Sequence, residues 1–146
     1  MKIHEIMTRN VITLLAETPI PEALESLFSH KISGLPVVDA DRRVVGMFTE
    51  KDVLRAILPS YVSQVGRFVY ENVSKTIKSK AEKLVSLKVA DLMRKDVIKV
   101  LEDVPVSEAA RLMLTQNVRR IPVVDAQERI VGIVARADVL KQILQR

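Results

Sequence analysis

Short runs of almost continuous apolar residues alternate along the chain with stretches in which apolar positions recur every three or four residues. Two of these runs, 35–38 and 44–48, are typical of buried strands, and a polar turn at 39–43 separates them. A β-rich run at 11–14 precedes both. We therefore predict a small sheet in the first third of the chain.

Helical spacing fills the gaps between these predicted strands. Pro19 and the carboxylate of Glu22 mark a helix start, and apolar residues then recur at helical spacing as far as Phe28. A second helix is predicted over 51–58, directly after the second apolar run. The order β-α-β-β-α predicts an α/β fold in which helices cover one face of a small sheet.

The same pattern occurs again 86 positions later. Residues 5–58 and 91–144 align without a gap and share 20 identities in 54 positions. The clearest match joins the motif h-P-V-V-D-A at 35–40 to the same motif at 121–126, where h is an apolar residue. A match of this length indicates a duplicated unit. We expect the two copies to pack about a local two-fold axis, with a pair of clefts between them.

The duplication divides the chain into three parts. We predict a first repeat at 1–58, a helical insert at 59–88 and a second repeat at 89–146. Apolar residues in the insert recur at spacings of three or four, which predicts an amphipathic helix. These positions are Val62, Val65, Val69, Val73, Ile77, Ala81 and Leu84.

The chain is basic, with 23 Lys and Arg against 18 Asp and Glu and a formal net charge of +5. Most of the excess lies in the insert. A basic balance favours a polyanionic partner such as a nucleic acid, a phosphate-bearing ligand or an acidic protein. Two interpretations of the insert stay open, a solvated helix face and a contact surface for an acidic partner. The wide spread of its lysines favours the solvated face.

Composition excludes several kinds of chemistry. The chain has 146 residues, no cysteine and two histidines, so disulfides and thiolate metal sites are excluded and we predict no metal and no required cofactor. No apolar run approaches the roughly 20 residues of a membrane span. Charges in 1–5 stand where a signal peptide has its apolar stretch. We expect a cytoplasmic protein without membrane insertion. No base–nucleophile–orienter set stands out, so we expect no enzyme activity.

The segment 46–52, Gly-Met-Phe-Thr-Glu-Lys-Asp, carries the most chemical information. A strand runs into a helix start there, and the free N–H groups of a helix start suit phosphate. Thr49 could donate to a phosphate, and Asp52 could accept from ribose hydroxyls. The pair also fits a capping box, which this copy alone favours. In the second copy Ala135 replaces the threonine, so the reciprocal cap cannot form, while Asp138 is kept. That difference favours a ligand role.

The segments before the two Pro-Val-Val strands differ between the copies. The first has small residues that would let a flat base approach the backbone. The second has two adjacent arginines, which would either grip phosphates or form an exposed surface pair. The sequence leaves both interpretations open. The residues are Ile32, Ser33 and Gly34 in the first copy and Val118, Arg119 and Arg120 in the second.

Together these motifs resemble a tandem pair of cystathionine-β-synthase (CBS) domains, the arrangement called a Bateman module. The resemblance rests on h-P-V-V-D-A twice, on V-G-h-h-T-x-x-D at 45–52 with V-G-h-h-A-x-x-D at 131–138, and on paired methionines at Met7 and Met93. It implies repeats with sheets packed face to face, two clefts per pair, and commonly a dimer of pairs. It also implies an adenosine-containing ligand, such as AMP, ADP, ATP or S-adenosylmethionine.

The resemblance implies that each cleft is built across the two repeats. The first cleft would place Asp52 on the ribose and Thr49 on a phosphate. Val118 would line the base, and Arg119 and Arg120 would reach the phosphates.

The second cleft would place Asp138 on the ribose, with 32–34 around the adenine. Ala135 departs from the usual Thr or Ser, which weakens phosphate binding, although Arg136 is placed to compensate. The first cleft is therefore the expected site for a phosphorylated ligand, and the second would take an adenosine-like ligand or stay empty.

The leading functional prediction is a stand-alone regulatory module, a homodimer that senses energy state through AMP, ADP or ATP and signals to a separate effector protein. The alternative is a nucleic-acid-binding or scaffold protein that uses the basic insert and has vestigial clefts. Nucleic acid is less favoured because no basic–aromatic interleaving is present.

Overall fold

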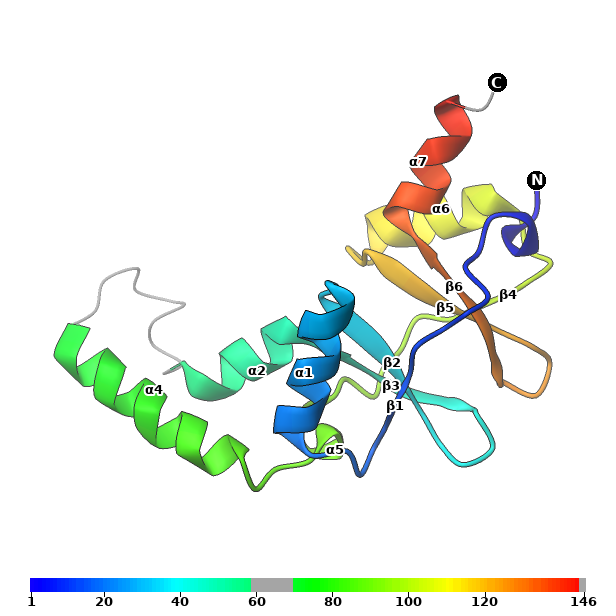
Figure 1. The fold of residues 1–146 in the computed structure, drawn as a ribbon. Coiled ribbons are helices and arrows are strands. Elements are labelled where there is room, and N and C mark those ends of the chain that lie inside the picture. The colour runs from blue at the N-terminus through cyan, green and yellow to red at the C-terminus, as the bar shows by residue number, and fades with distance from the viewer. Residues whose placement is uncertain (59–69, 145–146) are drawn as a thin grey trace. The chain divides into compact units, whose positions relative to one another are not determined.

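The computed structural model describes residues 1–58 and 70–144, with side chains described outside 70–76. It contains two three-stranded sheets with helices, in the orders β1-β2-β3 and β4-β5-β6 (Figure 1). The first repeat comprises the 3-10 helix η1 and the elements β1, α1, β2, β3 and α2. Their bounds are Ile3–Glu5, Leu14–Leu15, Ile20–His30, Gly34–Val38, Val44–Thr49 and Glu50–Ile57.

The second repeat contains the same series of elements. The helices and strands are α5 (Val89–Leu92), β4 (Val100–Leu101), α6 (Val106–Thr115), β5 (Arg120–Val124), β6 (Ile130–Ala135) and α7 (Arg136–Leu144). The predicted α/β fold of two β-α-β-β-α repeats is confirmed. The leading strands are shorter than predicted, since β1 includes only the end of the 11–14 run and one residue beyond it.

The pairing and the burial of the strands show which of their faces lie in a core. β4 runs parallel to β5, and β5 runs antiparallel to β6 with Ile121 opposite Val134. Every residue of β2 is buried, while β3 and β6 alternate buried and half-buried residues. That alternation places one face of each of these strands in a core.

Left-handed backbone closes the turns at matching positions in the two repeats. Lys31 and Asn117, 86 residues apart, have φ of 54° and 52°, and Arg42 and Glu128 have φ of 65° and 64°. None of the four is glycine, although this conformation costs other residues free energy. The predicted polar turn at 39–43 is confirmed.

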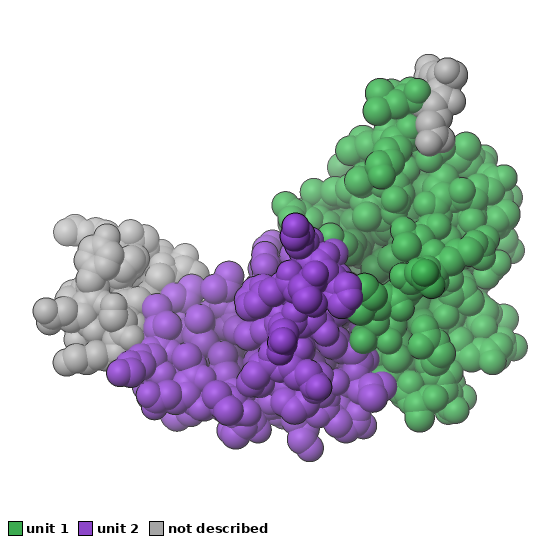
Figure 2. Space-filling view, viewed as in Figure 1, with its two compact units in different colours: residues 1–13, 38–45, 96–146 green, residues 14–37, 46–95 purple. Residues whose placement is uncertain are grey.

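Contacts group the chain into two compact units (Figure 2). Unit 1 comprises 1–13, 38–45 and 96–146, and unit 2 comprises 14–37 and 46–95. Apart from 38–45, which belongs to unit 1, each unit combines the body of one repeat with the leading segment of the other, where the leading segments are 1–13 and 86–95.

The exchange of leading segments follows the same pattern in both units. In unit 1, Lys2 bridges to Pro105 and Thr8 bridges to Ile133. In unit 2 the residues at the positions shifted by 86 form the equivalent β-bridges, Lys88 with Pro19 and Arg94 with Met47. Each leading segment thus adds backbone pairing to the opposite repeat.

Apolar side chains of the leading segments enter the cores. Ile3 is fully buried and Met7 nearly so, in one cluster with Met113, Ile121 and Val134 of the second repeat. Burying a side chain of this size contributes about 1.5–3 kcal/mol. The leading segment is thus part of the core of unit 1.

The insert forms α4 (Tyr70–Leu84), which contacts α2 within unit 2. Leu84 is buried and Ile77 is half-buried, as the predicted apolar stripe requires. Ala81 is exposed, so that member of the stripe is wrong. The predicted stripe positions 62, 65 and 69 lie outside the described residues. Among the described helices, none is both long and apolar enough to cross a membrane.

Candidate functional site

The turn from β3 into α2 holds the first predicted site residues. The Thr49 backbone N–H donates to Asp52 Oδ2 at 2.8 Å, and the Thr49 hydroxyl donates to the same oxygen at 3.2 Å. Among the described residues, Asp52 is the only charged residue that is buried. A buried carboxylate needs such donors to offset its lost hydration. The capping interaction is therefore present, and the Thr49 hydroxyl is engaged with Asp52.

Arg55 completes the hydrogen bonding of Asp52. Its Nη1 donates to Asp52 Oδ1 at 3.0 Å, and the side chain of Arg55 is 65% exposed while that of Asp52 is 2% exposed. Sequence reasoning missed Arg55. The available signal was its spacing of three from Asp52, which places both residues on one face of α2.

The matching turn from β6 into α7 has a simpler arrangement. The Ala135 backbone N–H donates to Asp138 Oδ2 at 2.8 Å. Ala135 removes only the hydroxyl half of the cap. The half made by the aspartate persists, because it requires only a backbone N–H, so the change to Ala135 favours a ligand role less than the sequence suggests. Asp138 is half-buried. Lys141 matches Arg55 in position, yet in the ranges that the structure covers it forms no ion pair with Asp138.

The segment before β2 lies beside the Thr49 turn in unit 2. The Ser33 carbonyl accepts from the Glu50 N–H at 2.9 Å. A Cβ added to Gly34 would lie 2.8 Å from Thr49 Cγ2, so this close approach requires glycine. Ile32 is half-buried, and its N–H donates to the Leu27 carbonyl.

The segment before β5 lies beside the Ala135 turn in unit 1. The Arg119 carbonyl accepts from the Arg136 N–H at 3.0 Å, and Arg120 stands opposite Ala135 in the strand register. The backbones of three arginines thus meet at the start of α7. Arg119 and Arg136 are exposed, and Arg120 is half-buried. Val118 packs against the core of unit 1, which gives it a structural role.

Each strand-to-helix turn is therefore joined to the pre-proline segment of its own repeat. The predicted clefts combine the turn of one repeat with the segment of the other, and these halves belong to different units. The composition of both clefts stays a prediction from the resemblance.

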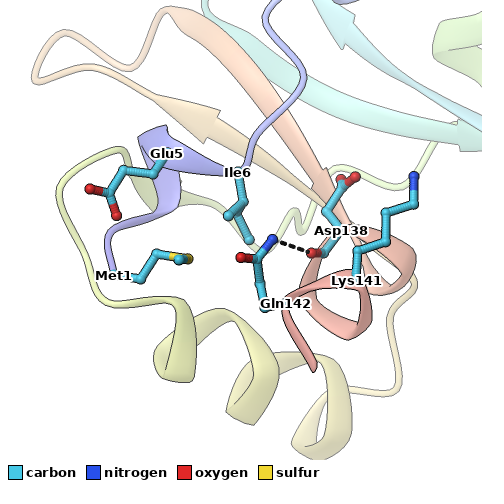
Figure 3. A pocket seen from close by; sticks show the side chains of 6 residues that line it. All are labelled: Met1, Glu5, Ile6, Asp138, Lys141 and Gln142. Atoms are coloured by element: carbon cyan, nitrogen blue, oxygen red, sulfur yellow. Dashed lines mark hydrogen bonds between the residues drawn. The ribbon is translucent and has the colours of Figure 1, made fainter. Parts of the chain in front are cut away.

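A groove of about 260 Å³ lies in unit 1 and includes Asp138 (Figure 3). Residues around η1 form one side and residues of α7 form the other. Glu5 also accepts the Lys2 backbone N–H at 2.8 Å, and Gln142 Nε2 donates to the Asp138 carbonyl at 3.2 Å. The lining residues are Met1, Glu5, Ile6, Asp138, Lys141 and Gln142.

Sequence reasoning predicted only Asp138 among these lining residues. The others gave no signal, because the contact of the first leading segment with α7 depends on the exchange between repeats. Within the described ranges, no group of three or more acidic or histidine side chains is arranged to hold a metal ion.

Comparison with known proteins gives a consistent result. A family model described as the CBS domain matches residues 3–59 and, a second time, residues 89–145. A CBS domain-containing protein of Dictyostelium discoideum is 33% identical over 143 residues, which cover 98% of this chain and 91% of the relative. The chain is also 34% identical over 141 residues to inosine-5′-monophosphate dehydrogenase of Methanocaldococcus jannaschii, but these cover only 23% of that enzyme.

Solved structures share the fold. CBSX2 from Arabidopsis thaliana, a CBS-pair protein, has a TM-score of 0.80 at 28% identity and covers 99% of this chain and 94% of its own. A structure of CBSX2 in complex with AMP has a TM-score of 0.77 at 29% identity, over 99% and 96% of the two chains. The CBS domain pair of protein MJ0100, in complex with 5′-methylthioadenosine and S-adenosylmethionine, has a TM-score of 0.75 at 27% identity, over 99% and 97%. With two matches to the family model that together span most of its length, the chain belongs to the CBS-domain family and carries the domain twice.

Proposed function

We propose that this protein is a regulatory module that binds an adenosine-containing ligand and passes its bound state to a separate effector protein. The observation that carries the proposal is the matched placement of Asp52 and Asp138. Each carboxylate follows a glycine-containing strand at the same spacing, and each accepts a backbone N–H at 2.8 Å in the first turn of a helix. Such a turn offers a carboxylate for ribose hydroxyls at the positive end of a helix dipole, which favours phosphate.

The ligands of two related structures support this choice. AMP, 5′-methylthioadenosine and S-adenosylmethionine share the adenosine group and differ in what is attached at its 5′ carbon. A ligand recognised through adenosine would use the features that both repeats keep. The 5′ substituent would contact the features that differ between the repeats.

The first site is the one we assign to a phosphorylated ligand, AMP, ADP or ATP. Asp52 would accept from the ribose hydroxyls, and Thr49 would donate to a phosphate after its hydroxyl turns away from Asp52. Val118, Arg119 and Arg120 of the second repeat would complete this cleft.

The second site would use Asp138 for the ribose and 32–34 for the base. Ala135 offers no hydroxyl, and Arg136 is the exposed cation nearest in sequence to that position. We assign this site to a nucleoside or to a ligand such as S-adenosylmethionine, whose 5′ group carries no phosphate.

Ligand binding would act on the effector through the free energy of binding. At a ligand concentration 100-fold above Kd, binding stabilises the bound form by about 2.7 kcal/mol. That free energy changes the effector only where two states of the module differ in ligand affinity.

Exposed apolar side chains at matching positions support a homodimer. Phe28 on α1 is 68% exposed, and its counterpart Leu114 on α6 is 85% exposed. Leu54 on α2 is 49% exposed, and its counterpart Leu140 on α7 is 59% exposed. Apolar side chains kept outward in both repeats are typical of surfaces that another chain covers. We infer that these helices form the dimer interface.

Thermal unfolding with AMP, ADP, ATP, S-adenosylmethionine and adenosine tests the proposed function. At least one ligand should raise the melting temperature of the wild-type protein. Asp52→Asn together with Asp138→Asn should abolish the rise, because asparagine can keep the cap acceptor but not the charge. A chain that none of the ligands stabilises would contradict the proposal and favour the scaffold alternative.

A further inference from the structure

Besides the Thr49 hydroxyl and their burial, the two aspartates differ in their ion pairing. Asp52 has an ion-pair partner on its own helix, because Arg55 Nη1 lies 3.0 Å from Asp52 Oδ1. Asp138 has a lysine at the equivalent position, and the described residues contain no ion pair between the two. A ribose would therefore meet an ion-paired carboxylate at the first site and a carboxylate without an ion pair to its own helix at the second.

We propose that Arg55 makes the first site selective for phosphorylated ligands by competing with the ribose for Asp52. This inference rests on the proposed function. Both oxygens of Asp52 accept hydrogen bonds from the protein, Oδ2 from Thr49 and Oδ1 from Arg55. Ribose hydroxyls that bind to Oδ1 compete with the guanidinium for that oxygen.

The fate of the displaced guanidinium decides which ligand binds well. Its bond to Asp52 already holds Arg55 near the first turn of α2, where the positive end of the helix dipole favours a phosphate. A nucleotide supplies a phosphate as the new partner of the guanidinium, and arginine is well suited to phosphate geometry. A nucleoside supplies no such partner, so it breaks the ion pair without replacing it.

Exposure makes this exchange feasible. The Arg55 side chain is 65% exposed, so the guanidinium can leave Asp52 without moving the core. Ion pairs whose two charges are both exposed contribute about 0.2–1 kcal/mol, and because Asp52 is buried we take the top of this range, an affinity difference of about fivefold. That value sets the size of the expected selectivity.

Isothermal titration calorimetry with adenosine and with AMP tests the inference. Asp138→Asn serves as the background, so that the first site is observed alone. In this background AMP should bind more tightly than adenosine. Adding Arg55→Met should tighten adenosine binding by up to about fivefold and leave AMP unchanged or weaker, so the preference for AMP falls.

Arg111→Met is the matched control. Arg111 pairs with Glu108 on α6 at the same spacing of three, with Arg111 Nη2 at 2.6 Å from Glu108 Oε1 and a side chain that is 58% exposed. Its removal breaks a comparable ion pair away from the site, so the preference for AMP should not change.

The outcomes separate the two claims. An unchanged preference in Arg55→Met, with AMP still bound, overturns the role of Arg55 and leaves the proposed function standing. Equal weakening of both ligands also overturns it, because Arg55 would then only position Asp52. A background variant that binds neither ligand overturns the proposed first site, and the role of Arg55 with it.

Discussion

The backbone N–H of Ala135 donates to the carboxylate of Asp138 at 2.8 Å, although Ala135 has no hydroxyl to complete a capping box. The cap therefore survives the loss of the threonine. An aspartate at this position stabilises its helix in both repeats, whatever it binds. Capping and ligand binding must be separated by experiment.

Alanine and asparagine substitutions separate the two roles. Asp138→Ala removes the acceptor for the Ala135 N–H and should lower the free energy of unfolding by about 1 kcal/mol. Asp138→Asn keeps an acceptor and should stay closer to wild type, while ligand binding at the second site is lost in both. Urea unfolding measures the first effect and calorimetry the second. Equal stability of the two variants would show that the cap contributes nothing.

Exchanging the residues at the two turns should exchange ligand preference. Ala135→Thr adds a hydroxyl to the second turn, and Thr49→Ala removes one from the first. We expect AMP to bind more tightly to the second site of Ala135→Thr and less tightly to the first site of Thr49→Ala, in each case by a factor of about ten or less, the worth of one hydrogen bond. Adenosine affinity is the internal control, since it should change little. Calorimetry with the other aspartate replaced by asparagine assigns the change to one site.

Gly132→Ala tests how tightly the first leading segment is held. A Cβ at Gly132 would lie 2.5 Å from Met7 Sδ and 3.0 Å from the Thr8 carbonyl oxygen. The thioether can move but the backbone oxygen cannot move freely, so we expect a loss of about 1–3 kcal/mol in the free energy of unfolding. Urea unfolding checks this value.

Gly46→Ala is the matched variant in unit 2. There a Cβ would lie 2.6 Å from Met93 Sδ and 2.9 Å from the Arg94 carbonyl oxygen, so a similar loss is expected. Wild-type stability in either variant would mean that the leading segment of that unit can shift to admit the Cβ with no loss in the free energy of unfolding.

Asp125 gives the stability of the protein a dependence on pH. Burial raises its pKa, but hydrogen bonds from the backbone N–H groups of Arg129 and Gln127 and from the Arg129 side chain outweigh it, so the pKa falls below the ordinary value of 3.8. A carboxylate with a lowered pKa stabilises the folded state above that ordinary value, and the stabilisation is lost as pH falls through the folded-state pKa. Acid should therefore remove the contribution of Asp125.

Asp125→Asn measures this contribution. The variant should be less stable than wild type at neutral pH, and the difference should shrink once the pH lies below 3.8. Arg129→Met, which removes the side-chain donor, should show a smaller pH dependence than wild type. A difference between Asp125→Asn and wild type that stays constant with pH would contradict the assignment.

Charge on the exposed apolar positions should disrupt the dimer. Leu114→Glu and Phe28→Glu each place a carboxylate on a helix face that we assign to the interface. The expected result is a shift toward monomer in light scattering, with the circular dichroism of the wild type retained. Glu25→Gln is the control, because it changes the charge of an exposed residue of α1 that we do not assign to the interface, and it should leave the dimer intact. A wild-type chain that is monomeric at high concentration would contradict the interface.

Much of the fold could be predicted because the duplication doubles each local signal. The Pro-Val-Val strands, the polar turns and the helix starts after Pro19 and Pro105 all follow from short-range pattern. The left-handed conformation of Lys31 could not be predicted, since lysine has no preference for it, whereas Asn117 is a residue type that adopts it readily.

The site was predictable only in part, for a related reason. Asp52 and Asp138 belong to a motif of contiguous residues, so the sequence alone identifies them. Arg55 has only its spacing of three from Asp52 as a signal in the sequence, and its bond to Asp52 Oδ1 becomes evident in the structure. Glu5 and Ile6 meet α7 through a contact between segments that are far apart in sequence.

The exchanged leading segments bear on the ancestry of the chain. In a single repeat, Thr8 or Arg94 would lack its β-bridge partner in the other repeat. The core of unit 1 would also lack the buried side chain of Ile3. An ancestor encoded by one repeat could have completed itself only by trading these segments with a second copy of itself. The tandem chain supplies both copies in one molecule, so its two halves can differ at matching positions, as Thr49 and Ala135 do.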